Sequence, residues 1–428
     1  NNIKMFNFNL IKLSLLAAFL WLNNSSWLQA QSASPSLTSH WDRDFSRLDA
    51  SDTRLITLPD GGYLYFGYPD SEASGFKSEN SRGGSDYWVL KLDANWKKVW
   101  DNSLGGSENE VLKDVIALED GGLILGGYSS SGASADKSEG SRGGRDFWLV
   151  KLDKNGQKIW DKTYGGDQDE TFSKIQLLAD GSMILGGSSQ SGISGEKSQA
   201  RQGESDYWII HVDAEGNILW DKTFGGNQAD ELVDITLLKD GSLLLGGNST
   251  SGVSGDKTEA NGETWIIRTD DQGNKVWDKT YVNVLADMLL LPDGAIALGG
   301  NEVFDPIFQV FSLIKINEQG EQFWARTYIP KNDDTQAETL VRIISKPGVG
   351  ILCLGHSNLI PRGFNEIILN IDPSSGDKIW DEVKSFRIEI DAKYVDPFFV
   401  FAEVTDANSF KPRGGSAVRV ITTCGSIS

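Results

Sequence analysis

The sequence predicts an all-β protein built as a ring of seven four-stranded antiparallel sheets, the architecture called a β-propeller. Three observations lead to this prediction: a long internal repeat, apolar–polar alternation at period two within each repeat, and 47 glycines against 11 prolines and 3 methionines. No helical periodicity occurs after residue 31. Coiled coils, collagens and polytopic membrane proteins are therefore excluded as classes.

An eight-residue segment marks the repeat. Asp86–Asp93 reads Asp-Tyr-Trp-Val-Leu-Lys-Leu-Asp, with close copies at Asp146–Asp153 and Asp206–Asp213 and a looser one from Glu263 to Asp270. A second tryptophan follows each copy, usually as Trp-Asp. This series comprises Trp41, Trp100, Trp160, Trp220, Trp277, Trp324 and Trp380, spaced 47 to 60 residues apart. Seven copies indicate seven blades, because each unit buries its apolar faces only against its neighbours.

The unit after Trp100 shows how a blade is built. Val111–Leu118 and Leu123–Tyr128 alternate apolar and polar residues around an Asp-Gly-Gly turn, since aspartate and glycine tolerate positive φ. A Gly/Ser-rich loop at 129–145 leads to Phe147–Asp153, and a Lys-Asn-Gly turn leads to Lys158–Tyr164. Each unit therefore contains four strands, A to D, in an antiparallel order.

The two ends of the chain predict closure of the ring. The segment around Trp41 reads as a lone D strand, while Arg387–Tyr394, Phe398–Val404 and Ala417–Thr422 read as strands A, B and C of a last blade. We expect the N-terminal segment to supply the missing outer strand, which closes the ring and removes an exposed sheet edge.

Residues 1–31 read as a secretory signal peptide with an upstream extension. Lys12 precedes an apolar run, Leu13–Leu22, that is too short to span a membrane, and Ala30 provides a small-residue cleavage site. We expect an exported protein in the periplasm, at the cell surface or outside the cell, with residues 32–428 as a single monomeric propeller domain. The net charge of −20 opposes binding to nucleic acid.

The tryptophans of the repeat have a structural interpretation. Besides the Trp-Asp series, the C strands carry Trp88, Trp148, Trp208 and Trp265. An aromatic platform for sugars is the functional alternative. We favour rings that fill the space between blades, because a scaffold role recurs in every blade whereas a site occurs once.

The repeat resembles a known group of proteins. Gly105-Gly106 before an acidic cluster, the Asp-Gly-Gly turn, Leu-Gly-Gly-x-Ser and Asp-Tyr-Trp-Val-x-Lys-Leu-Asp resemble the seven-bladed β-propeller repeats of secreted bacterial proteins. The motifs Gly-x-Ser-x-Ser and Gly-Asp-Lys-Ser-Glu are similar to those of surface and secreted proteins of Bacteroidetes that are exported through the type IX route. The resemblance is strong over residues 39–300 and weaker over 300–422, and it implies a location at or beyond the cell surface.

A weaker resemblance concerns Ile371–Trp380. Its sequence, Ile-Asp-Pro-Ser-Ser-Gly-Asp-Lys-Ile-Trp, is similar to the tryptophan-docking repeat of quinoprotein-type propellers. Some members of that family hold pyrroloquinoline quinone with calcium, and others are non-catalytic assembly factors. We interpret the resemblance as shared blade construction.

Candidate ligand-binding residues lie where the long loops emerge. In a propeller, the B-to-C and D-to-A connections share one face, and only that face has long loops here. Lys137, Lys197 and Lys257 recur at equivalent places in these loops. They form either a ring of contacts for a polysaccharide or protein, or internal ion pairs and hydrogen bonds that fold each loop back on itself.

The links between blades carry acidic clusters, which suggest calcium as a candidate ion. Asp167, Asp169 and Glu170 are the candidate ligands, because calcium prefers six to eight oxygens. The EF-hand spacing is absent, and the three histidines after residue 31 are isolated, which argues against a transition-metal site. We otherwise expect no cofactor. Pairing of Cys353 with Cys424 stays open.

A second candidate area is the sector where the repeat breaks down. Blades five to seven replace the long loop by Asn301–Gln309, His356–Asn365 and Thr405–Ser416. The candidate ligand-binding residues of this lower sector are His356, Arg362 and Arg413, with Phe364 and Lys411 beside them.

These observations favour a non-enzymatic binding or scaffold module for a protein or polysaccharide partner. The sequence contains no Gly-x-Ser-x-Gly elbow and no phosphate-binding loop. A polysaccharide hydrolase or lyase that uses carboxylates of the long-loop face is one alternative, since such an enzyme needs only two acids. A quinoprotein-like cofactor binder is another.

Overall fold

The computed structural model describes residues 54–390 and 418–423, except 74, 261, 306–307, 329–337, 347–349 and 360–362. Every regular element in this part of the chain is a β-strand, and the strands form six antiparallel sheets. No helix in the part described has the length and apolar character needed to cross a membrane. The all-β prediction is therefore confirmed for these residues.

The sheets follow one another along the chain. The first three consist of β1 (Arg54–Thr57), β2 (Tyr63–Gly67), β3 (Tyr87–Leu92) and β4 (Lys98–Leu104); β5 (Glu110–Ala117), β6 (Leu123–Ser129), β7 (Asp146–Leu152) and β8 (Lys158–Tyr164); and β9 (Glu170–Leu177), β10 (Met183–Ser189), β11 (Asp206–Val212) and β12 (Ile218–Phe224).

The remaining sheets continue this order. They consist of β13 (Asp230–Leu237), β14 (Leu243–Ser249), β15 (Thr264–Thr269) and β16 (Lys275–Tyr281); β17 (Val284–Leu290), β18 (Ile296–Asp305), β19 (Phe308–Ile316) and β20 (Gln322–Tyr328); and β21 (Glu338–Lys346), β22 (Gly350–Leu359), β23 (Gly363–Ile371), β24 (Lys378–Ile390) and β25 (Val418–Thr423).

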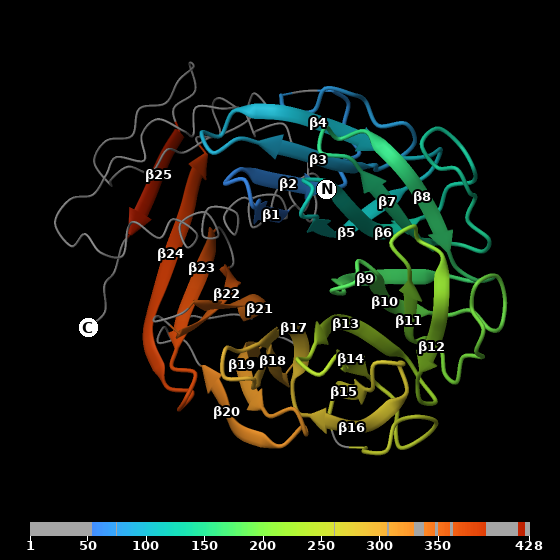
Figure 1. Ribbon diagram of the computed structural model, residues 1–428. Coiled ribbons are helices and arrows are strands. Elements are labelled where there is room, and N and C mark those ends of the chain that lie inside the picture. The colour runs from blue at the N-terminus through green and yellow to red at the C-terminus, as the bar shows by residue number, and fades with distance from the viewer. Residues whose placement is uncertain are drawn as a thin grey trace.

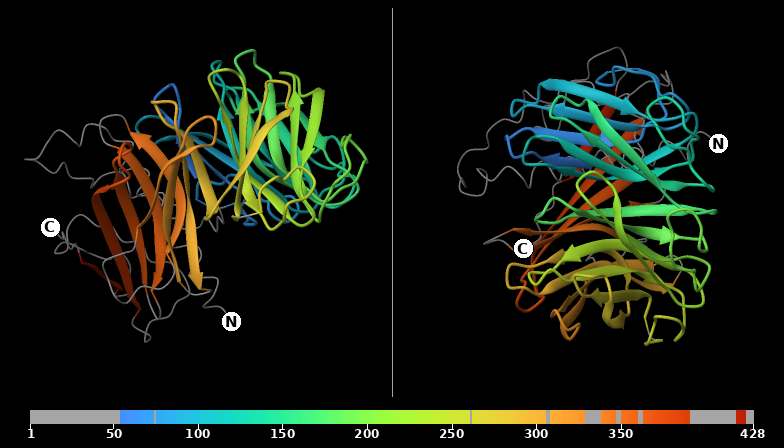
Figure 2. Two further views of the ribbon diagram at one scale, coloured as in Figure 1. Left: turned by 90° about the horizontal axis from the view of Figure 1, so that it is seen from below. Right: turned by 45° about the vertical axis from the view of Figure 1, so that its right-hand side comes forward.

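The six sheets are arranged around a common centre, which is consistent with a β-propeller. Figure 1 shows the first strand of each sheet, β1, β5, β9, β13, β17 and β21, nearest that centre, with β4, β8, β12, β16 and β20 at the periphery. Neighbouring sheets face one another, as the two further views show (Figure 2). The inner strands β5, β9, β13, β17 and β21 contact one another in this order.

The second sheet shows why the repeat forms these strands. In β7, six of seven residues are buried, because a neighbouring sheet covers each face of the strand. The turn to β8 ends with Gly156 at φ +82°, a left-handed conformation that favours glycine. Gly156 also leaves space for a neighbouring sheet, since a Cβ there would lie 2.9 Å from the Trp100 ring.

This Trp–Gly contact recurs at every junction between described sheets. The outer-strand tryptophan of one sheet packs on the glycine in the C-to-D turn of the next sheet, at Trp100–Gly156, Trp160–Gly216, Trp220–Gly273, Trp277–Gly320 and Trp324–Gly376. The C-strand residues Trp88, Trp148, Trp208 and Trp265 are fully buried. The space-filling interpretation of the tryptophans fits this burial. Trp41 lies outside the described residues, and only the backbone pairing of Trp380 with Asn370 is described.

The strand assignment at the C-terminal end needs a correction. Arg387–Tyr394 was expected to begin a seventh blade, but Arg387 belongs to β24, the continuous outer strand of the sixth sheet. Ala417–Thr422 was expected as a C strand, and instead β25 (Val418–Thr423) pairs with β24 as a fifth strand of the sixth sheet. An apolar alternation does not show whether a strand continues or a new one begins, which explains the error. Phe398–Val404 lies outside the described residues, so six sheets are described rather than seven.

Candidate functional site

Four long B-to-C loops, at 68–86, 130–145, 190–205 and 250–263, emerge on the same face as the links between sheets. Backbone hydrogen bonds join loop to link: the amides of Asp136, Glu196 and Asp256 donate to the carbonyls of Gly105, Gly165 and Gly225, at 3.1, 3.0 and 2.8 Å. We call this side of the molecule the long-loop face. The loops are anchored to the scaffold at their bases.

The candidate lysines of these loops are buried. Lys137 donates from Nζ to Thr163 Oγ1, and Lys197 donates to Thr223 Oγ1 and, at 2.9 Å, to the carbonyl of Gln199. Lys257 Nζ lies 2.8 Å from Ser249 Oγ and from the Ser251 carbonyl. Each ammonium group thus holds its own loop. Of the two interpretations of these lysines, this geometry favours internal hydrogen bonding, and a direct ligand contact has no support in it.

The aspartate of the Trp-Asp dipeptide completes the anchor. In the second sheet, Asp161 Oδ2 accepts hydrogen bonds from Trp148 Nε1 at 3.1 Å and from the amide of Ser138 at 2.8 Å, while Oδ1 pairs with Lys158 Nζ at 2.8 Å. Burial acts to raise the pKa of Asp161, but the hydrogen bonds from Lys158, Ser138 and Trp148 outweigh it and hold the pKa below its ordinary value. The carboxylate thereby joins loop, C strand and D strand.

The same anchor recurs in three other sheets. The acceptors are Asp101, Asp221 and Asp278, with the indoles of Trp88, Trp208 and Trp265 and the loop amides of Ser78, Ser198 and Thr258. Two motifs that appear separate in the sequence, Trp-Asp and Lys-Ser-Glu, are therefore parts of one structural unit. We call this unit, with the buried loop lysine, the loop anchor.

Buried carboxyl groups lie beneath the links between sheets. Glu170 Oε1 accepts hydrogen bonds from Ser189 Oγ at 2.7 Å and Ser191 Oγ at 2.6 Å, and Oε2 accepts one from the Gly166 amide at 2.9 Å. Burial raises the pKa of Glu170 to about 7, and the buried neighbour Asp146 adds to the effect. Glu170 is therefore a structural acid that is partly protonated near neutral pH.

Equivalent acid pairs occur at two further junctions. Burial, and next to it the charge of Glu110, raises the pKa of Asp86 to about 6. Burial and Asp230 likewise raise the pKa of Asp206. At the fourth junction an acid, Glu263, again occupies the first position of the pair. The second position is Asn283, whose Oδ1 accepts a hydrogen bond from Thr264 Oγ1 at 3.1 Å. Only one of the two acids is therefore replaced at this junction.

The predicted calcium ligands have separate partners. Asp167 Oδ1 accepts a hydrogen bond from Ser194 Oγ at 3.0 Å, and Asp169 Oδ2 pairs with Arg145 Nη2 at 2.9 Å. Glu170 is buried among the serines described above. Among the described residues, no group of three or more His, Cys, Asp or Glu side chains is placed to hold a metal ion. The structure does not bring these three acids together.

The lower sector has a different construction from the one expected. Asn301–Gln309 and His356–Asn365 were expected as loops, but most of both segments pairs within β18–β19 and β22–β23. These strands form extended β-ribbons in place of the long loops. His356 lies on β22, opposite Glu366 of β23, while Arg362 and Arg413 lie outside the described residues.

The sequence interpretation overlooked a set of charged residues near the centre. The innermost strands place Arg54, Asp114, Lys174, Asp234, Asp287 and Arg342 at equivalent positions of the repeat. Lys174 Nζ lies 3.4 Å from Asp234 Oδ1, and burial, followed by the charge of Asp234, raises the pKa of Asp287 to about 6. An alignment of the repeats would reveal these positions, because each of the first five precedes its Asp-Gly turn by a constant interval.

The tips of the long loops carry exposed apolar side chains. In the third and fourth loops, Ser194–Lys197 and Ser254–Lys257 form small antiparallel bridges that end each tip. Ile193 and Val253, which precede these bridges, are 69% and 63% exposed. The long-loop face therefore presents apolar contacts on an anchored backbone.

Comparisons with known proteins show only distant similarity to this chain. No family model matches the sequence. The regulatory protein FlaEY of Caulobacter vibrioides is 24% identical over 180 residues, which is 40% of this chain. That match spans 19% of FlaEY, about a fifth of its length.

Three solved structures show similarity at low identity. The WD40 domain of Neurospora crassa Pan2 has a TM-score of 0.42 and 9% identity, over 78% of this chain and 85% of that one. A polysaccharide lyase of family PL25, an ulvan lyase, has a TM-score of 0.42 and 12% identity, over 79% and 78%. A Synechocystis apocarotenoid oxygenase variant has a TM-score of 0.42 and 13% identity, over 77% and 71%.

Proposed function

We propose that this protein is a non-enzymatic binding or scaffold module whose long-loop face contacts a protein partner. The observation that supports the proposal most directly is the exposure of Ile193 and Val253 at the tips of anchored loops. Large apolar side chains at the ends of long loops are positioned for contact with another macromolecule. A protein surface suits them better than a polysaccharide, because aliphatic side chains find apolar partners there.

The loop anchors favour binding energetically. A loop that orders on binding loses about 0.5–1.5 kcal/mol for each side chain it immobilises, and a pre-ordered loop avoids part of that loss. The buried Lys197 and Lys257 and the aspartates Asp221 and Asp278 fix these loops before any partner arrives. Burial of one isoleucine side chain contributes about 1.5–3 kcal/mol, so two tips supply a useful part of an interface.

An extracellular polysaccharide hydrolase or lyase stays the alternative. Such an enzyme needs two carboxyl groups that reach the sugar, and inverting and retaining glycosidases hold them about 5–9.5 Å apart. The carboxyl pair described above, Asp146 and Glu170, is buried beneath the link and serves the scaffold. Release of reducing ends or unsaturated products from a polysaccharide by the purified protein would contradict the non-enzymatic proposal. A quinoprotein-like site or a calcium site predicts a rise in melting temperature when the cofactor is added.

Export and the blade number belong to the same proposal. We infer that residues 1–31 direct export to the bacterial surface or beyond, as in the Bacteroidetes proteins that the repeat resembles, and that the mature protein is a monomer. A seventh blade would be formed by segments outside the described residues, with Trp41 in its outer strand. N-terminal sequencing of the secreted protein tests whether residues 1–31 direct export. Deletion of residues 32–53, followed by measurement of the free energy of unfolding, tests the seventh blade.

The experiment for the binding role uses two matched isoleucines. Ile193 is 69% exposed on a loop tip, and Ile159 is 57% exposed on the peripheral strand β8. Immobilised wild type, Ile193→Asp and Ile159→Asp would be compared for capture of proteins from a cell-surface extract, and the captured protein would then be purified. We expect Ile193→Asp to weaken its binding at least about tenfold, which corresponds to 1.4 kcal/mol. Equal loss in both variants, or no loss in Ile193→Asp, would contradict the proposal.

A further inference from the structure

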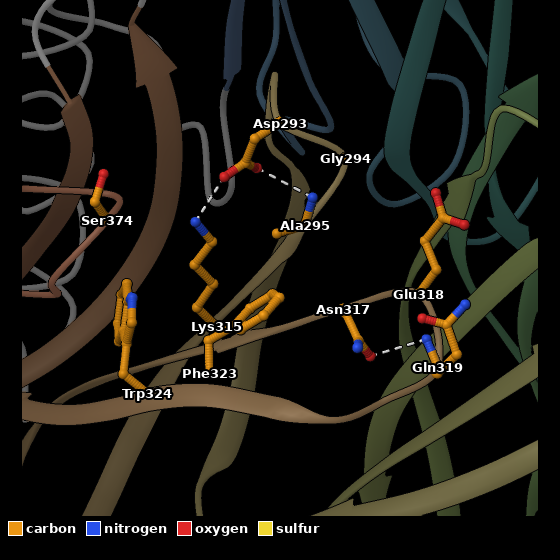
Figure 3. Close-up of a pocket in the computed structure, with 10 residues that line it drawn as sticks. All are labelled: Asp293, Gly294, Ala295, Lys315, Asn317, Glu318, Gln319, Phe323, Trp324 and Ser374. Carbon is orange, nitrogen blue, oxygen red and sulfur yellow. Dashed lines mark hydrogen bonds and ion pairs between the residues drawn. The ribbon is translucent and has the colours of Figure 1, made fainter.

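A cavity of about 690 Å³ lies on the side opposite the long-loop face, where the fifth and sixth sheets meet. Its lining comes from the A-to-B turn of the fifth sheet, the C-to-D turn of that sheet, β20, and the C-to-D turn of the sixth sheet (Figure 3). The three turns are fixed by hydrogen bonds from the amides of Gly294, Gly320 and Gly376, and β20 is fixed by its pairing with β19. The cavity is therefore set by the scaffold rather than by the anchored loops.

Two departures from the repeat distinguish this junction. The C-to-D turn of the sixth sheet is one residue longer, since the Asp372 amide bonds to the Asp377 carbonyl, whereas the Asp153 amide of the second sheet bonds to the Gln157 carbonyl. The second departure is Phe323, whose ring is 61% exposed. The other sheets have aliphatic residues at this position, namely Val99, Ile159, Leu219, Val276 and Ile379.

The cavity also contains a buried donor that has no partner among the described residues. Trp324 is 7% exposed, and its Nε1 makes no hydrogen bond there. At the first junction, the equivalent Trp100 Nε1 donates to the Lys154 carbonyl at 3.2 Å. The indole of Trp277 also lacks a partner, but its neighbour Val276 presents no aromatic ring. A buried donor without an acceptor destabilises the protein, and an acceptor on a ligand would remove that cost.

The charges of the cavity leave little attraction for an anion. Lys315 Nζ pairs with Asp293 Oδ2 at 2.7 Å and donates to the Pro373 carbonyl at 2.8 Å, so its charge is matched within the protein. The same ammonium group lies 5.7 Å from the centre of the Phe323 ring and supports one side of it (Figure 3). Glu318 adds a negative charge to the lining, and the whole chain carries −20. Acidic ligands are disfavoured by this field.

We propose that this cavity binds a neutral pyranose unit of an oligosaccharide or polysaccharide. The open face of Phe323 provides an apolar surface for the C–H groups of a sugar ring. The Trp324 indole donates to a ring or hydroxyl oxygen. Glu318, Gln319 and Ser374 supply a carboxylate, an amide and a hydroxyl at the cavity rim for sugar hydroxyl groups. This combination of one aromatic face with a few convergent polar groups is typical of small-molecule sites.

The saccharide site is independent of the protein-binding role of the long-loop face. The two lie on opposite sides of the sheets, and none of the residues that line the cavity belongs to a long loop. A saccharide on the turn side and a protein on the loop side would be held by the same rigid body. The Ile193→Asp variant should therefore bind saccharides as the wild type does, so the two proposals fail separately.

The test measures binding of defined oligosaccharides to the purified protein by isothermal titration and by saturation-transfer NMR. The probes are cellotetraose, mannotetraose, laminaritetraose and chitotetraose, with tetragalacturonate as the acidic contrast. We expect at least one neutral probe to bind with a Kd of about 0.1–1 mM, and tetragalacturonate to bind more weakly or not at all.

Two variants locate the binding. Phe323→Val restores the side-chain type of the other sheets, and we expect it to weaken binding about threefold to tenfold because the stacking contact is lost. Trp324→Phe keeps a ring but removes the N–H, and it should weaken binding by a similar factor. Val276→Ala, at the equivalent position of the fourth sheet, is the control and should change nothing. Melting curves of all variants verify that they are folded. Absence of binding to every neutral probe, preference for tetragalacturonate, or unchanged binding in both cavity variants would overturn the proposal.

Discussion

The first four sheets and the last two described sheets make the same B-to-C connection in different ways. The first four use a long loop held by the loop anchor, whereas the fifth and sixth extend both strands into a ribbon. In the fifth sheet, Ser312 replaces the C-strand tryptophan and Ala325 replaces the aspartate of Trp-Asp. In the fifth sheet these two anchoring residues are therefore absent together with the loop, which links them to the loop rather than to the sheet.

The sixth sheet separates two parts of the anchor. It has Ile367 in place of the C-strand tryptophan, yet it keeps Asp381 paired with Lys378 at 2.9 Å. The ion pair on the outer strand thus persists in a sheet without the loop. The indole and the loop amide, the other partners of the carboxylate, are found only in sheets with the loop. We therefore expect the carboxylate of Trp-Asp to contribute most to stability where it is buried under a loop.

The largest expected effect follows from removing that carboxylate in an anchored sheet. Asp161→Ala leaves the buried Trp148 indole and the Ser138 amide without this acceptor, and Lys158 without its ion-pair partner. We expect a loss of about 3–5 kcal/mol in the free energy of unfolding, measured by urea denaturation. Asp381→Ala, in the sheet without a loop, is the matched control and should cost less than about 1 kcal/mol, since its ion pair is partly exposed. Similar losses in the two variants would show that the buried loop contacts contribute little.

The buried acid pairs predict an intermediate effect that depends on pH. The pKa of Glu170 is about 7 in the folded protein, against an ordinary value of about 4.3 in the unfolded chain. The stability that this proton contributes is complete below about pH 4 and is lost as the pH rises to 7. We expect the free energy of unfolding to be lower at pH 8 than at pH 5, by an amount on the order of 2 kcal/mol.

A double variant that removes both carboxyl groups of the second junction measures this contribution. Asp146→Asn with Glu170→Gln keeps the size of the two side chains and removes both titrating groups. The difference in unfolding free energy between pH 5 and pH 8 should become smaller than in the wild type. Asp167→Asn, an exposed acid of the same link, should leave that difference unchanged. An identical pH dependence in the wild type and the double variant would disprove the role of the pair.

The smallest expected effect concerns the buried loop lysine. Lys137→Met keeps the length and apolar stem of the side chain but removes the hydrogen bond to Thr163. We expect a loss of about 1–2 kcal/mol and faster proteolytic cleavage within residues 130–145, because the loop loses its internal support. Lys154→Met, on an exposed turn of the same sheet, is the control for both measurements. Unchanged cleavage of the loop would argue that the aspartate alone fixes it.

The sequence predicted the repeated part of the fold closely because turn residues and alternation are local signals. The expected strand Lys158–Tyr164 coincides with β8, and Leu123–Tyr128 differs from β6 by one residue. The tertiary features were harder to predict. The sequence left open whether Lys137 contacts a ligand or holds its own loop, since a lysine is rarely buried, and the contact with Thr163 favours the second interpretation. The cavity at Phe323 arises from a junction between two sheets, and local patterns carry no signal for it.

The Trp–Gly contact between sheets has a consequence for how such a chain changes in evolution. Each of the second to fifth sheets offers a tryptophan to the sheet that follows and a glycine to the sheet that precedes, so the contact at Trp100–Gly156 is equivalent to that at Trp277–Gly320. A duplicated unit inserted between any two others would therefore find complementary surfaces on both sides without new substitutions. The number of units can then grow or shrink by recombination within the gene, and only the first and last units need features of their own.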